Sequence, residues 1–117
     1  MVWAATITET ELAWIDTEFN DVVQRVPVGQ DIQGCAIAGS IVWVANWGED
    51  TLQGVDVGTA EVVATTQVGD RPIDVAVAPE GVWVVNEGDA SVSLVDPQAG
   101  RVVTEVAIAG ATRVAYG

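Results

Sequence analysis

The chain has 117 residues, half of them hydrophobic, so it is long enough for one small domain with its own core, and its composition excludes a disordered chain. It carries 17 acidic residues against four arginines, without lysine or histidine, for a net charge of −13. Such a charge opposes binding to nucleic acid and to anionic membranes, because both need cationic side chains. We interpret the acidity as a means of keeping a β-rich surface soluble, with cation binding or a high-salt source as alternatives.

Short β-branched and aromatic segments alternate with Gly, Asp and Pro turns along the whole chain, and no segment has helical periodicity. The first part predicts strands at 1–7, 12–16, 22–28 and 35–38. The middle part predicts strands at 42–46, 51–57, 62–68 and 73–78. The last part predicts strands at 82–86, 91–96, 101–108 and 113–116. The sequence therefore predicts an all-β chain.

One stretch occurs three times with a strict spacing. VWVANWGEDTLQGVD at 42–56 recurs as VWVVNEGDASVSLVD at 82–96 and, in a weaker copy, as VWAATITETELAWID at 2–16. The units thus begin at Val2, Val42 and Val82 within a single module, residues 1–117. Four antiparallel strands per unit of this length are typical of a β-propeller blade.

Stacking of such sheets buries the two apolar faces that an isolated sheet would expose. In the middle unit we predict that Trp43, Val55, Val63 and Val75 form the core between sheets. The aspartates that end each third strand are followed by turn residues, so we interpret them as turn formers; they are Asp16, Asp56 and Asp96. Cys35 lies in the apolar run CAIA, which favours a small buried side chain over a reactive thiol.

The middle unit carries the pattern VWVAN-x-G-x-x-[TS]-[LV]-x-x-[VL]-D, followed by G-x-x-VV-x-T and VG-x-x-P-x-x-VAV. This pattern resembles the YVTN/NHL-like propeller repeats, a group that includes YncE-like and streptogramin-lyase-like proteins. The resemblance covers the whole chain and implies the fold, but it says little about function. The streptogramin lyases use histidines and a carboxylate with a divalent metal. Because this chain lacks histidine, none of their catalytic residues can be carried over, and a His-ligated zinc or iron site is excluded.

The phase of the repeat predicts how the chain closes. The chain starts on the second strand of a unit and ends on RVAY, Arg113–Tyr116, which matches the first-strand segment Asp74–Val77. We expect this last strand to complete the N-terminal blade, a one-plus-three closure. The residues predicted to make it are Val2, Trp3, Arg113, Val114, Ala115 and Tyr116.

Three blades are too few for a ring, since known propellers have four to eight. An open arc would expose apolar sheet faces and an unpaired edge. We therefore expect head-to-tail homo-oligomerisation, with the last strand of one chain completing the next. A homodimer with a six-blade ring is the main expectation, and a homotrimer is the alternative. An evolutionary or engineered propeller fragment with no function beyond self-association is a further one.

Two sets of loops are expected to meet at the mouth of the central channel. One set precedes each first strand, at 30–34, 69–74 and 110–113, and the other joins second to third strands, at 6–11, 46–51 and 86–91. The candidate ligand-binding residues there are Asn46, Trp47, Glu49, Asp50, Arg71, Asp74, Asn86, Glu87 and Arg113. Solvated loops with capped turns are one interpretation, and an acidic mouth for a cation or basic ligand is the other. Calcium is conceivable, although no EF-hand pattern is present.

Trp47 occupies a turn where the other units have Ile7 and Glu87, so the core does not demand it. It could stack on a sugar or pack on a neighbouring loop. Arg71 and Arg113 could reach the mouth or pair with acids such as Asp74.

The function favoured by the sequence is binding and scaffolding by self-assembly, without catalysis or cofactor. The alternative is an enzyme that uses mouth carboxylates with a divalent ion. Because the sequence shows neither a signal peptide nor an apolar stretch long enough to span a membrane, a soluble, cytoplasmic protein is the default expectation.

Overall fold

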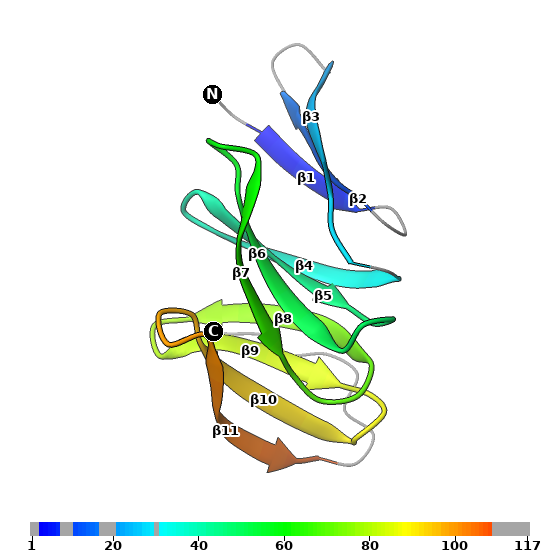
Figure 1. Ribbon diagram of the computed structural model, residues 1–117, viewed down its shortest axis with the longest axis vertical. Helices are drawn as coiled ribbons and strands as arrows, with labels where there is room; N and C mark the ends of the chain where they lie inside the picture. Colours follow the sequence, from blue (N-terminus) through cyan, green and yellow to red (C-terminus); the bar gives the residue numbers. More distant parts are fainter. Residues whose placement is uncertain (1–2, 8–10, 17–20, 30, 109–117) are drawn as a thin grey trace.

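A computed structural model describes residues 3–7, 11–16, 21–29 and 31–108. In these residues the regular structure consists of β-strands in three antiparallel sheets, which follow one another from top to bottom in Figure 1. Within the same residues no helix is long and apolar enough to cross a membrane. The predicted all-β class is therefore confirmed.

Within each sheet, every strand pairs with the next strand along the chain. The first sheet holds β1 (Trp3–Ile7), β2 (Glu11–Asp16) and β3 (Asp21–Pro27). The second sheet holds β4 (Ile32–Ala38), β5 (Ile41–Asn46), β6 (Thr51–Asp56) and β7 (Glu61–Gln67). The third sheet holds β8 (Pro72–Ala78), β9 (Gly81–Asn86), β10 (Ser91–Asp96) and β11 (Arg101–Ala107). The predicted last strand, 113–116, lies outside the described residues.

Two hydrophobic clusters lie between the sheets. One joins the first sheet to the second and includes Leu12, Val26 and Val44; the other joins the second to the third and includes Trp43 and Val84. Successive side chains of a strand point to opposite faces, so Trp43 and Val44 on β5 serve different clusters. The stacking of the sheets thus buries both faces of the second sheet. The predictions for Trp43, Val55 and Val75 are confirmed.

The prediction that Val63 belongs to the core is wrong. Val63 is 53% exposed. The pairing of β6 with β7 shifts register between Gly54 and Val55, so that Val62 opposes Val55 and Ala64 opposes Gly54 while Val63 has no partner. This is a β-bulge, which leaves the extra residue outside the ladder and bends the strand.

The same shift occurs in the outermost pair of every sheet. Gln24 and Val22 are successive partners of β2, so that Val23 is skipped, and Thr104 and Val102 are successive partners of β10, so that Val103 is skipped. The bulge therefore repeats with the period of the sequence.

The inner strands β4 and β8 lie against each other. A Cβ atom added at Gly34 on β4 would lie 2.9 Å from the carbonyl oxygen of Ile73, so only glycine fits this approach. In the first sheet, β1 pairs with β2 alone among the described strands. The first sheet thus has three described strands where each of the others has four.

Candidate functional site

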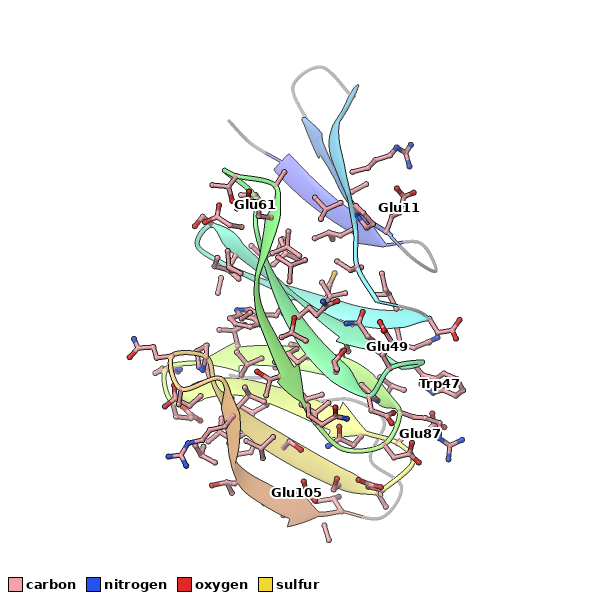
Figure 2. All side chains as sticks on the ribbon, viewed as in Figure 1. Glu11, Trp47, Glu49, Glu61, Glu87 and Glu105 are labelled. Carbon is pink, nitrogen blue, oxygen red and sulfur yellow. The ribbon has the colours of Figure 1, made fainter. Side chains whose placement is uncertain are left out.

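The predicted mouth loops of the second and third sheets lie at one end of these sheets. The Trp47 amide donates to the Asp31 carbonyl at 3.0 Å, and the Glu87 amide donates to the Arg71 carbonyl, also at 3.0 Å. These bonds join the turn after the second strand to the segment before the first. Figure 2 shows Trp47, Glu49 and Glu87 on one side of the molecule and Glu61 on the opposite side.

Asn86 supports its loop from beneath. Its side chain is fully buried, and its Nδ2 donates to Ser93 Oγ at 2.7 Å and Ser91 Oγ at 3.2 Å. Its Oδ1 accepts the Gly69 amide at 3.1 Å. All these partners belong to the protein, so Asn86 fixes the entry into β8 and lies under the mouth surface.

Asn46 takes the equivalent position one unit earlier and is equally buried. Its Nδ2 donates to Gln53 Oε1 at 2.7 Å and Thr51 Oγ1 at 3.0 Å. The Gly29 amide, however, donates to Gln53 Oε1 at 3.0 Å. Asn46 Oδ1 consequently has no hydrogen-bond partner among the described residues.

Trp47 and Arg71 connect the loops of neighbouring sheets. The guanidinium carbon of Arg71 lies 5.8 Å from the centroid of the Trp47 ring, a cation–π distance. Arg71 Nε lies 3.7 Å from Asp70 Oδ2, and its backbone amide donates to Asp50 Oδ1 at 2.9 Å. Packing on a neighbouring loop therefore accounts for the position of Trp47, whereas stacking on a sugar stays a prediction.

The remaining predicted residues are spread more widely. Asp74 lies on β8, where its backbone and carboxylate approach Gly34 of β4, below the loops. Burial, and secondarily the negative charge of Asp74, raise the pKa of the Cys35 thiol. Cys35 is half-buried, which is less than the burial that the sequence predicts. Arg113 lies outside the described residues.

Among the described residues, no three Asp, Glu or Cys side chains come close enough to hold a metal ion. Asp56 and Asp96 instead act as predicted turn formers. Asp56 Oδ1 accepts the Gly58 amide at 2.7 Å, and Asp96 Oδ1 accepts the Gln98 amide at 2.9 Å.

The opposite end of the two sheets has a concave feature that no sequence pattern predicts. A groove of about 530 Å³ opens between the second and third sheets. Its walls combine apolar side chains with the carboxylate residues Glu80 and Asp96. It was missed because it is formed by two units together, and each unit alone shows only a turn. The one signal was the set of small residues at the turns: Ala38, Ala78 and Gly81.

No protein-family model and no curated protein sequence matches the chain. Solved structures do match. Hydrazine synthase of Kuenenia stuttgartiensis is similar at a TM-score of 0.82 with 19% identity, over 89% of this chain and 32% of that one. AztD of Citrobacter koseri is similar at a TM-score of 0.78 with 15% identity, over 92% and 32% of the two chains. The Pan2 WD40 domain of Neurospora crassa gives 0.72 with 14% identity, over 88% and 32%.

The fold is that of a β-propeller. The predicted β-propeller fold is confirmed, and the three sheets correspond to blades. The chain spans about a third of the length of the structures it matches. Identities this low show the fold alone, so the activities of these proteins do not extend to this chain.

Proposed function

We propose that this chain is a self-assembling propeller module, built from YVTN/NHL-like repeats, that binds a second copy of itself. Two copies would form a six-blade ring by head-to-tail contact, and a homotrimer is the alternative. The module would act by binding and scaffolding, without catalysis. The observation that carries this proposal is that β1 pairs with β2 alone among the described strands, whereas β5 and β9 each have an inner strand beside them.

The side chains of β4 are less buried than their counterparts on β8. Cys35 and Ile37 face the first sheet and correspond to Val75 and Val77 on β8, one unit later. Val75 is 5% exposed, and Val77 packs against the cluster between the second and third sheets. Cys35 is only half-buried, and Ile37 is 49% exposed. An inner strand next to β1 would cover these two residues, and its position in another copy would explain the difference in burial.

The outer face of the third blade supports the same proposal. Val68, after β7, packs against the third sheet, but its counterpart Ile108 is 46% exposed. Trp83 likewise is partly exposed, whereas its counterpart Trp43 is buried. These positions are apolar in both units and are covered only where another blade follows, so a further blade is the occupant that fits them.

The closing strand that we propose is Arg113–Tyr116 of another copy. It would pair by strand addition with the edge of β1 that no described strand occupies, which provides main-chain hydrogen bonds together with apolar contacts. Sedimentation or light scattering should then give a dimer of about twice the 12.2 kDa chain mass. Deletion of 113–117 should yield monomers. A stable monomer of the unaltered chain at micromolar concentration, or an unchanged oligomer after the deletion, would overturn the proposal.

Two charge substitutions provide a matched test. Ile108→Glu places a carboxylate where the preceding unit has a packed Val68, so it should weaken association at least about tenfold. Val103→Glu is the control, because its counterpart Val63 remains exposed although a blade follows it. Equal effects of the two substitutions would indicate that this face is not an interface.

Ligand binding at the mouth is a separate part of the proposal. It is supported by the gathering of Asp50, Asp70 and Glu87 around Arg71, whose guanidinium lies over the half-buried Trp47. A thermal-shift screen with calcium and with glycans tests it. An unchanged unfolding temperature in both series would remove this site and the metal-dependent enzyme alternative together.

A further inference from the structure

The groove between the second and third sheets has the dimensions of a small-molecule site. Its volume of about 530 Å³ falls within the range typical of ligand pockets. It lies beside the turns that end β4 and β8, at the opposite end from Trp47 and Arg71. Both walls belong to one chain, so the groove does not depend on the proposed assembly.

The groove is held open by backbone that has little freedom to collapse. Gly81 has a φ of +148°, and a Cβ atom added there would lie 2.4 Å from the Val95 carbonyl oxygen, so no side chain fits. Pro79 and Pro97 fix the two flanking turns. Ala38 and Ala78 leave space where larger residues would fill it.

The two sides of the groove differ in chemistry. Ile41, Trp43, Val77 and Val82 give it apolar walls. The polar side carries Glu80, Asp96 and Gln98, so that the lining from the described residues has two carboxylates and no arginine. Since the chain as a whole has a charge of −13, the local field favours a cation.

Asp96 is the better anchor of the two carboxylates. Its Oδ1 accepts the amides of Gln98 at 2.9 Å and Ala99 at 3.2 Å, which fixes the orientation of the carboxylate. Its Oδ2 has no hydrogen-bond partner among the described residues. Glu80 Oε1, in contrast, accepts the indole N–H of Trp83 at 3.1 Å.

We propose that this groove binds a small organic cation, an ammonium group carrying an apolar body. The ammonium group pairs with Asp96, and the apolar body lies against Ile41, Val77 and Val82. A neutral ligand of the same shape gains only the apolar contact, and an anion is repelled by both carboxylates.

The probe pair is 2-phenylethylammonium and 2-phenylethanol, which have similar shapes and differ in charge. Calorimetry measures affinity, and amide chemical shifts of Gly81, Gln98 and Ala99 locate the site. The ammonium should bind saturably at millimolar concentration and shift these amides, and the alcohol should bind at least about threefold more weakly. No saturable binding, shifts elsewhere only, or equal binding of the alcohol would overturn the proposal.

The repeat supplies a matched pair of variants. Asp96→Asn keeps an Oδ1 acceptor for the turn but removes the charge, so affinity for 2-phenylethylammonium should fall about threefold to tenfold. Asp56→Asn makes the same change in the equivalent turn one unit earlier, which does not line the groove, and should leave affinity unchanged. Ala38→Leu fills the groove and should abolish binding. Equal losses for the two Asp variants, or retained binding in Ala38→Leu, would contradict the proposal.

Discussion

Asn46 and Asn86 occupy equivalent positions at the ends of β5 and β9, yet their surroundings differ. Asn86 uses both its amide nitrogen and its oxygen within the protein. At Asn46 the glycine amide is taken by Gln53, and the amide oxygen stays without a partner among the described residues. The second blade has Gln53 where the third blade has Ser93, and this difference changes which side chain accepts the glycine amide of the loop.

This difference predicts unequal stability losses. Asn86→Ala removes three hydrogen bonds from a buried site and should cost about 2–4 kcal/mol in the free energy of unfolding. Asn46→Ala removes two hydrogen bonds and also one unsatisfied acceptor, so it should cost about 1–2 kcal/mol. Urea unfolding measures both. A larger loss for Asn46→Ala would show that its oxygen has a partner in solution.

The sequence predicted where single residues lie along the strands and loops, but it did not predict how deeply Asn46 and Asn86 are buried. An Asn at a strand end usually indicates an exposed turn. The spacing from Asn86 to Ser91 and Ser93, which recurs from Asn46 to Thr51 and Gln53, was the available signal. The positive φ angle of Arg71 had no signal in the sequence, because arginine, unlike aspartate, is not enriched in that conformation.

Among the elements, the turns between first and second strands differ in how tightly they are built. Gly39 in the second sheet has a φ of +61° with open space around its Cα. Gly81 in the third sheet has a φ of +148° and contacts the Val95 carbonyl oxygen closely. In the second sheet only the backbone conformation favours glycine in this turn. In the third sheet both the conformation and the close Val95 carbonyl oxygen favour it.

Alanine substitutions should separate these two causes. Gly39→Ala should cost about 1 kcal/mol, the price of a left-handed residue. Gly81→Ala should cost about 3 kcal/mol or more, because strand β10 must also move. Thermal unfolding of the two variants checks this. Similar losses would mean that β10 can move away from the added Cβ atom at little cost in free energy.

Strand positions could be predicted from the sequence because apolar alternation and Gly/Asp turns recur with one period. The fourth strand was the main exception, since it begins at Ile32 rather than at 35. Gln33 is skipped there by a register shift, which interrupts the alternation. The bulge at Val63 misled the core prediction in the same way.

For the whole molecule, charge opposes the association that the apolar faces favour. Each copy carries −13, and like charges repel when copies meet. Raising the salt concentration from about 0.01 M to 0.15 M shortens the screening length from roughly 30 to 8 Å. The dissociation constant of the proposed dimer should therefore fall by about threefold or more. Sedimentation equilibrium at the two salt concentrations measures it, and a rise would indicate an interface held by ion pairs.

The order of the three sheets followed from the repeat, because each unit contributes the same set of strands. The groove between the sheets could not be predicted. The groove is lined by residues of two blades, including Pro79 and Pro97. The repeat pattern of one unit does not predict how two blades lie against each other.

The bulges in the outermost strand pairs should also limit how copies of this chain can associate. β3, β7 and β11 each lie at the rim of a blade, where a flat edge would recruit strands from other molecules without limit. The skipped residue bends each rim strand and interrupts its ladder. We therefore expect little radial fibril growth, and the association that we propose around the propeller axis would end once a ring is complete.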